Sequence, residues 1–171
     1  MELTKICQAD GSWTEMSRQW EETCVRFGEN LEDYASASLP VLKELAFGAD
    51  MANSGVFSHI KDGQHKAICQ VNRTFLPGYD GQVLRVRHIV FAPEFDFQED
   101  IDLGDYASVL VGVFVGSVML ADNSMPSKHI KFHLKSPAER SFGNLFVDSL
   151  KEHTAFKEVN LKGSWIYLSK A

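Results

Sequence analysis

Residues 84–94 read LRVRHIVFAPE, a run of β-branched and aromatic residues followed by a proline and a glutamate. Valine, isoleucine and phenylalanine favour extended backbone, so the sequence predicts a strand over 83–91. Pro93 cannot donate a hydrogen bond to a neighbouring strand, and it is expected to lie beyond the end of this one. Because side chains alternate between the two faces of a strand, Arg85 and Arg87 share one face.

Upstream, the sequence predicts two helices and a hairpin. Ser12-Trp13-Thr14-Glu15 has the form of a capping box, in which serine and glutamate side chains satisfy free backbone donors at a helix start. Pro40 suits the first turn of a second helix, which Gly48 ends. The turn Lys61-Asp62-Gly63-Gln64 separates two strand-like runs and indicates a tight hairpin. The expected elements are a strand at 3–8, helices at 12–28 and 40–48, and strands at 56–60 and 66–71.

The apolar run at 106–121 fits two structures, because its valines favour a strand whereas its length favours a helix. A helix is preferred, with Asp105 as its N-cap. Ser108, Gly112 and Gly116 lie four residues apart and would form one smooth helix face, able to approach a sheet closely. The apolar stretch is shorter than the roughly 20 residues that cross a bilayer, so it is interpreted as a core element.

Downstream, residues 129–135 alternate between apolar and basic side chains, as in a half-buried strand. Ser136-Pro137-Ala138-Glu139 combines an N-cap serine, a first-turn proline and a capping-box glutamate, and predicts a helix that ends near His153. Two short runs, 159–161 and 165–168, are expected to close the chain as a hairpin.

In order, these elements are β-α-α-β-β-β-α-β-α-β-β, which resembles the GNAT N-acyltransferase family across nearly the whole chain. The resemblance implies an α/β (α+β) fold, in which one domain over residues 1–171 has a mixed sheet of about seven strands and four helices. Residues 84–94 are similar to the family's fourth strand, which commonly ends in a hydrophobic-x-Pro-Glu pattern. Residues 129–150 are similar to its fifth strand and fourth helix.

The resemblance implies acetyl-CoA or another acyl-CoA as cofactor. In the family, the pantetheine arm inserts between the fourth and fifth strands, and a Q/R-x-x-G-x-G/A turn holds the diphosphate at a helix N-terminus. Here Asp102, Asp105 and Ala107 occupy the three motif positions, and only Ala107 conforms. The residues that the resemblance assigns to coenzyme A binding are Ile89, Val90, Phe91, Gly104, Tyr106, Ala107 and Ser108.

Two features depart from the family. Residues 94–105 contain six carboxylates and neither lysine nor arginine, so the loop opposes a bound diphosphate. The tyrosine that commonly reprotonates the thiolate aligns with Gly143. The acidic loop lacks the D-x-D-x-D-G order of a calcium site, and no metal is expected.

His88 lies on the predicted strand near the expected cleft. An imidazole titrates near neutral pH, so His88 is the candidate catalytic base, with a hydrogen-bonded structural histidine as the alternative. Arg85 and Arg87 would form a basic patch with Lys131, His133 and Lys135 if the two strands are neighbours. The alternative is that these are ordinary solvated strand faces.

Composition and net charge limit the classes of partner and the cellular location that we expect. Hydrophobic residues at 44% and charged residues at 23% are ordinary globular values, and no secretory leader is apparent, so a cytoplasmic location is expected. A net charge of -6 opposes bulk attraction to nucleic acid or anionic lipid, and neither is an expected partner. The three cysteines, without CxxC spacing, are interpreted as reduced thiols.

Two functions follow from the resemblance. The first hypothesis is an acyltransferase of divergent GNAT type, which moves an acyl group from acyl-CoA or an acyl carrier to an amine. The second is a catalytically inactive GNAT-like binding or regulatory module, with a homodimer left open. An unrelated α/β fold is the remaining alternative.

Overall fold

The computed structural model describes residues 2–48, 52–151 and 154–171. Seven strands and five helices lie within these residues. The strands are β1 (Thr4–Ile6), β2 (Ser54–Lys61), β3 (Gln64–Phe75), β4 (Gln82–Phe91), β5 (His129–His133), β6 (Phe156–Lys162) and β7 (Trp165–Lys170). The helices are α1 (Ser12–Arg26), α2 (Leu39–Phe47), α3 (Glu94–Phe97), α4 (Leu103–Asp122) and α5 (Pro137–Lys151).

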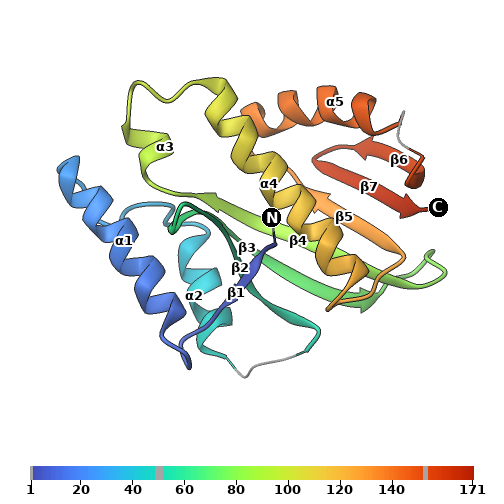
Figure 1. Ribbon diagram of the computed structural model, residues 1–171, viewed down its shortest axis with the longest axis horizontal. Helices are drawn as coiled ribbons and strands as arrows, with labels where there is room; N and C mark the ends of the chain where they lie inside the picture. The colour runs from blue at the N-terminus through green and yellow to red at the C-terminus, as the bar shows by residue number, and fades with distance from the viewer. Residues whose placement is uncertain (1, 49–51, 152–153) are drawn as a thin grey trace.

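The strands form one mixed sheet in the order β1-β2-β3-β4-β5-β7-β6 (Figure 1). Every neighbouring pair is antiparallel except β4 and β5, which are parallel. The predicted α/β class and order of elements are therefore confirmed. One difference is α3, a single turn that adds a fifth helix to the four expected. Pro93 precedes it with a φ of -56°, a helical value that its ring imposes.

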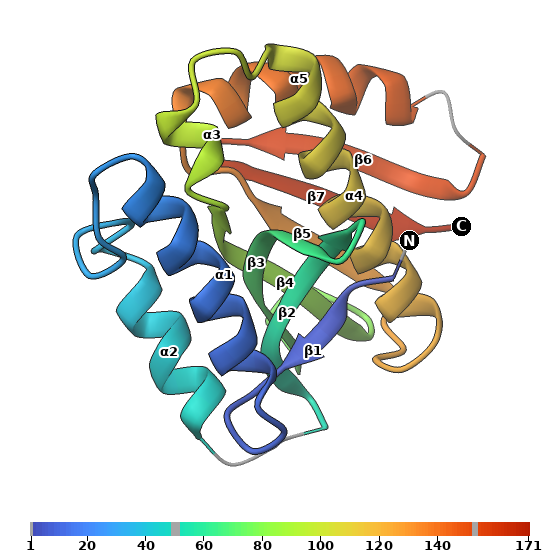
Figure 2. The same cartoon turned by 60° about the vertical axis from the view of Figure 1, so that its left-hand side comes forward.

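Helices cover the two faces of the sheet unequally (Figures 1 and 2). On one face α4 and α5 enclose a core that includes Leu84, Phe132 and Ile166, from β4, β5 and β7. On the other face α1 and α2 pack over β1, β2, β3 and the end of β4, around Trp20 and Ile68. This second core contains no residue of β5, β6 or β7 among those described, so half of that face carries no helix.

The run at 106–121 is a helix, as predicted, but it begins at Leu103. Two of the three small residues in the predicted face allow the close approach. A Cβ at Gly112 would lie 2.6 Å from His59 Nε2, and one at Gly116 would lie 2.6 Å from Leu3 Cγ. The prediction for Ser108 is wrong, because this residue is exposed beside the loop that precedes α4.

By length and composition α4 would be able to cross a membrane, although core helices of soluble proteins pass the same test. Its buried residues belong to the core under the sheet, including Val113 and Phe114. The extra turn at its start makes it longer than the apolar run considered in the sequence.

The helix caps agree with the sequence at α5 and differ at α1 and α4. At α5, Ser136 Oγ accepts from Glu139 N at 3.1 Å, and Glu139 Oε2 accepts from Ser136 N at 3.2 Å, which is the predicted capping box. At α1 the predicted box is wrong, because Ser12 is the first helical residue and its hydroxyl donates to Cys7 O instead. At α4 the N-cap is Asp102 rather than Asp105. The predicted end near His153 lies outside the described residues.

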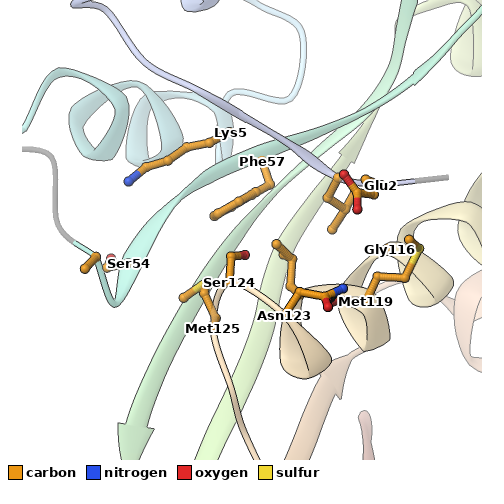
Figure 3. Close-up of a pocket in the computed structure, with 12 residues that line it drawn as sticks. Glu2, Lys5, Ser54, Phe57, Gly116, Met119, Asn123, Ser124 and Met125 are labelled. Atoms are coloured by element: carbon orange, nitrogen blue, oxygen red, sulfur yellow. Dashed lines mark hydrogen bonds between the residues drawn. The ribbon is translucent and has the colours of Figure 1, made fainter.

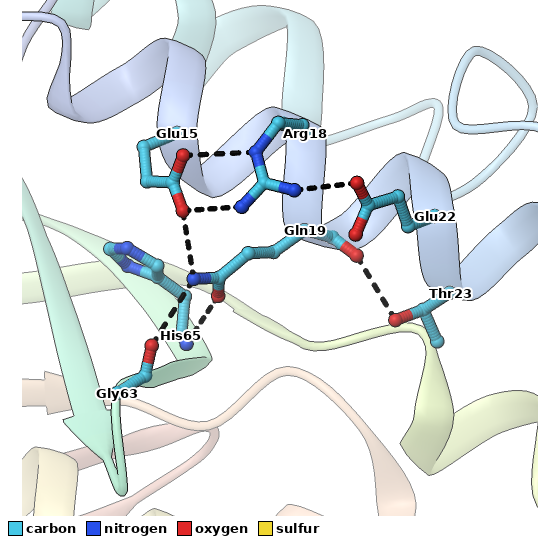
Figure 4. A network of polar contacts seen from close by, with 7 residues as sticks. All are labelled: Glu15, Arg18, Gln19, Glu22, Thr23, Gly63 and His65. Atoms are coloured by element: carbon cyan, nitrogen blue, oxygen red, sulfur yellow. Dashed lines mark hydrogen bonds and ion pairs between the residues drawn. The ribbon is translucent and has the colours of Figure 1, made fainter.

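Polar contacts fasten α1 to the β2–β3 hairpin (Figure 4). Gln19 Nε2 donates to Gly63 O at 3.1 Å, and Gln19 Oε1 accepts from His65 N at 3.1 Å. Trp20 Nε1 donates to His65 O at 2.8 Å. The His65 ring itself contacts buried Ser58 Oγ at 2.7 Å, so this Ser–His pair lies in the interior and serves packing.

We predict that Gly112→Ala destabilises the protein. Alanine normally stabilises a helix relative to glycine, but here its methyl group would enter the space of the buried His59 ring. Overpacking of this kind costs about 1–3 kcal/mol, which urea unfolding would measure.

Gly48→Ala is the matched control, because its Cβ would meet its nearest atoms at 3.6 Å, an ordinary contact. Its effect on the free energy of unfolding should stay within about 1 kcal/mol. In a His59→Ala background the cost of Gly112→Ala should shrink. Equal effects at Gly112 and Gly48 would contradict the close packing of α4.

Candidate functional site

The parallel pair β4–β5 separates halfway along. Four residue pairs join the strands, from Val83 opposite His129 to Val86 opposite Phe132, and no pairing follows. β4 continues to Phe91, so its last five residues present an unpaired edge toward β5. The separation that the family resemblance implied is therefore present.

A bulge accompanies the separation. Across from β3, Gln70 pairs with Arg87 and Ile68 pairs with Val90, so two residues of β4 face one residue of β3. His88 is one of the two and has a φ of 54°, a left-handed value that is uncommon outside glycine. Such bulges bend a strand, which explains why β4 leaves β5 at this point.

Side chains from α4 and α5 fill the gap on one side. The ring of Tyr106 stacks on Phe91, with centroids 4.2 Å apart, and its hydroxyl donates to Glu139 Oε1 at 3.2 Å. Glu139 is buried, and its other carboxylate oxygen, Oε2, caps α5. Burial raises the pKa of the Tyr106 hydroxyl, so the group is a hydrogen-bond donor at neutral pH.

On the opposite side, the loop between α1 and α2 reaches the same strand end. Tyr34 is buried, and its hydroxyl donates to Phe91 O at 2.5 Å. Lys135, just after β5, donates to Ser38 Oγ at 3.0 Å and so connects β5 with the start of α2. Ile89, Val90 and Phe91 are all buried in this arrangement. β4 therefore extends to Phe91, and these contacts enclose its end.

The N-terminus of α4 is occupied by the chain's own carboxylates. Asp102 Oδ1 accepts from Asp105 N at 2.8 Å, and Asp105 Oδ2 accepts from Asp102 N at 3.2 Å. A bound phosphate would need such backbone donors. Of the three predicted cofactor residues in the first two turns of α4, Gly104 and Ser108 are exposed and Ala107 is half-buried.

Two lysines whose position near the acidic loop was not predicted from the sequence lie beside it. A cavity of about 310 Å³ between the β2–β3 turn, α3 and the start of α4 is lined by Lys61 and Lys66, together with Glu94 and Asp105. Lys66 Nζ pairs with Glu94 Oε1 at 2.6 Å. Only the tertiary structure brings these cations to the loop, since they lie about thirty residues away in the chain.

His88 is half-buried beside the strand separation. Its Nδ1 is buried and has no hydrogen-bond partner among the described residues, which does not favour the structural-histidine alternative. Burial lowers the pKa of His88, and the nearby charges of Lys135, Arg87 and His133 lower it further. The imidazole is therefore neutral at pH 7, the state in which it accepts a proton.

The basic residues of β4 and β5 share one face, because Arg85 is the register partner of Lys131. Their aromatic neighbours in β7 were not predicted from the sequence. Lys131 Nζ lies 4.6 Å from the ring centre of Trp165 and 5.0 Å from that of Tyr167. The alternation of Trp165 and Tyr167 was a usable signal, since it places both rings on one face of a strand.

A separate cavity of about 470 Å³ lies between β1, β2 and the end of α4 (Figure 3). Phe57, Met119 and Met125 line it, with Glu2 and Lys5 also contributing. It is remote from the strand separation. No group of three or more histidine, cysteine, aspartate or glutamate side chains within the described ranges is arranged to hold a metal ion.

No protein-family model matches the sequence of this chain, and no curated protein matches it. Among solved structures, a putative GNAT-family acetyltransferase from Bacteroides thetaiotaomicron is 11% identical, with all of this chain and 88% of that one covered and a TM-score of 0.47. An aminoglycoside acetyltransferase from an uncultured soil metagenomic sample, in complex with sisomicin, is 9% identical over 95% of this chain and 93% of that one, with a TM-score of 0.43.

An acyl-CoA N-acyltransferase from Pseudomonas aeruginosa is 13% identical, with 99% of this chain and 97% of that one covered and a TM-score of 0.40. The order of elements, the single parallel pair β4–β5 and its separation are features of the chain itself. They give it a divergent GNAT-like fold.

Proposed function

We propose that the chain is an acyltransferase of divergent GNAT type, which transfers an acyl group from a thioester donor to an amine. The observation that carries the proposal is the end of the β4–β5 pairing at Val86, beside a neutral, half-buried His88. An unpaired strand edge offers main-chain groups to an extended ligand, as strand addition does in peptide recognition. The last residues of β4, 89–91, would hold the donor's arm in this way.

His88 is the proposed general base. An amine is mostly protonated at pH 7 and must lose a proton before its nitrogen attacks the thioester carbonyl. The neutral imidazole accepts that proton, and the nitrogen then attacks to form the C–N bond. The attacking nitrogen loses its second excess proton to solvent as the C–S bond breaks and a thiolate leaves. Gly143 occupies the position of the family's tyrosine and packs against Leu134, so the thiolate takes its proton from solvent.

The two ends of coenzyme A fit this site unequally. The edge of β4 suits an extended arm once Tyr106 turns away from Phe91. The start of α4 does not suit a diphosphate, because the two aspartate side chains occupy the backbone N–H groups of Asp102 and Asp105 and add negative charge there. Lys66, the nearby cation, is paired with Glu94. An acyl carrier fits better, because its pantetheine arm would place no diphosphate at the start of α4.

We therefore predict that free acetyl-CoA binds weakly, with a Kd above about 100 μM, or a binding free energy weaker than about -5.5 kcal/mol. Asp102→Asn with Asp105→Asn should tighten binding roughly tenfold, because asparagine keeps the capping oxygens while two negative charges are removed. Titration calorimetry would measure both proteins.

The control removes two exposed charges elsewhere, by Glu29→Gln with Glu32→Gln, and should leave the Kd within about twofold. Low-micromolar binding by the unaltered chain would refute the electrostatic argument.

Tyr106 is predicted to gate the arm site. Tyr106→Ala removes the ring that stacks on Phe91 and should tighten binding of S-acetyl-phosphopantetheine, a donor without the adenosine diphosphate portion. Tyr106→Phe keeps the ring, loses only the bond to Glu139, and should change the Kd little. Equal affinity in both variants would show that the ring does not close the site.

The pH dependence of transfer should report His88. The pKa of His88 is lowered from the ordinary histidine value near 6.5, so above that pH the imidazole is neutral and can act as a base. As the pH falls through the lowered pKa, the imidazole becomes protonated and can no longer accept a proton. Thiol release from S-acetyl-phosphopantetheine with a mixture of primary amines should therefore have a low-pH limb below about 6.5.

His88→Gln should reduce the rate about 100-fold and remove this limb. His129→Gln, at the opposite end of β5, should keep it. Undiminished transfer by His88→Gln would remove His88 from the mechanism.

The second candidate is a GNAT-like binding or regulatory module without catalysis. The specific observation in its favour is the closed strand end, where Tyr106 and Tyr34 contact Phe91 from both sides. This candidate would be favoured if neither acetyl-CoA nor S-acetyl-phosphopantetheine released thiol and if the Tyr106→Ala variant did not bind S-acetyl-phosphopantetheine.

A further inference from the structure

Half of one sheet face has no helix over it. The register aligns Arg85, Lys131, Tyr167 and Asn160 in one row across β4, β5, β7 and β6. A second row contains His133, Trp165 and Lys162. At about 4.8 Å between strands, four strands span roughly 14 Å, which is the scale of a small molecule. We refer to this surface as the open face.

The open face is strongly basic in a chain whose net charge is -6. None of its cations forms an ion pair with a carboxylate in the part of the chain that the structure describes. They are Arg85, Arg87, Lys131, Lys135 and Lys162. Burial, followed by the charges of Lys135 and Arg87, lowers the pKa of His133, which reports the same positive field.

Neutral groups hold these cations in place. Arg87 Nε donates to Gln70 Oε1 at 2.9 Å, and Lys135 donates to Ser38. Arg85 Nε is buried and has no partner among the described residues, and the same is true of Asn72 Oδ1 in the next strand. A buried donor without a partner is unfavourable.

Aromatic rings adjoin the cations. Trp165 packs against the His133 ring with centroids 4.5 Å apart, and Lys131 lies over both Trp165 and Tyr167. Lys162 Nζ, from β6 on the other side of β7, lies 5.9 Å from the Tyr167 ring centre. The face therefore offers flat apolar surface beside unpaired positive charge, and an anionic ligand with a planar ring complements both.

We propose that the open face binds a small organic amine that carries an acidic group and a planar ring. The acidic group lies between Arg85 and Lys131, and the ring lies against Trp165 and Tyr167. This ligand is the acyl acceptor, an assignment that rests on the proposed function. Arg87 lies between the open face and His88 along β4, so a ligand bound on the open face is close to the proposed base. Long polyanions are disfavoured, since Glu158 and Asp80 border the face and the acidic loop lies beyond the strand separation.

The test compares three probes of one shape by calorimetry on the whole chain, without any acyl donor. Tyramine has the ring and amine only, tyrosine adds a carboxylate, and phosphotyrosine adds a phosphate as well. We expect tyrosine or phosphotyrosine to bind at least roughly tenfold more tightly than tyramine, the scale of a hydrogen bond to a charged group. Their order distinguishes a carboxylate from a phosphate ligand.

The variant Arg85→Gln with Lys131→Gln should lose about tenfold in affinity for the tighter probe. The matched control, Arg26→Gln with Lys43→Gln, removes the same two charges from exposed positions on α1 and α2 and should bind within about twofold of the unaltered chain. Thermal unfolding establishes that both variants fold. If the Arg85→Gln, Lys131→Gln variant does not fold, the single variant Lys131→Gln replaces it. Changes in the NMR shifts of β5 and β7 backbone amides, measured on the unaltered chain as the probe is added, then locate the site.

Equal or tighter binding of tyramine, or unchanged binding by the Arg85 and Lys131 variants, overturns the proposal. Tighter binding of a single-stranded ten-nucleotide thymidine oligomer than of phosphotyrosine also overturns it, because the ligand would then be a polymer. The binding test contains no acyl donor, so its result does not depend on transferase activity. If the anionic probes bind but no transferase activity is found, the proposed reaction is refuted and the binding site on the open face is retained.

Discussion

The bulge at His88 is the constraint on which the site depends. An extra residue in β4 leaves its pairing with β3 intact on both sides but turns the strand away from β5. The part of β4 beyond Val86 therefore has an edge that does not pair with β5. The bulge residue also places an imidazole at the separation, so backbone geometry and the candidate base have a common origin.

Charge is divided between two regions that lie on either side of this separation. Carboxylates surround the start of α4, where the family resemblance expects a phosphate, and cations occupy the open face of β4, β5, β7 and β6. For the proposed acyl transfer, this distribution favours a donor with little negative charge and an acceptor with an acidic group. The reverse assignment would set like charges against each other at both places.

Local signals predicted the elements well and their details less well. The capping box at Ser136 and Glu139 was confirmed because both partners belong to one helical turn. The similar motif at Ser12 failed because its hydroxyl found Cys7 O, which a tight turn brings close. Ser108 shared the spacing of Gly112 and Gly116, yet α4 extends beyond the edge of its packing surface at that point. Spacing therefore identified the face of the helix but not how far the contact runs.

By itself, the sequence determined the order of strands and helices apart from the single turn α3, the alternation that puts Arg85, Arg87 and Lys131 on one side of their strands, and the acidic loop. These follow from periodicity and composition, which are properties of neighbouring residues. Only the tertiary structure decided that Tyr106 closes the strand end, that Lys66 reaches the acidic loop, and that Trp165 and Tyr167 join the basic residues. Each of these depends on which strands become neighbours, and that choice is made by burial of the whole core rather than by any local stretch.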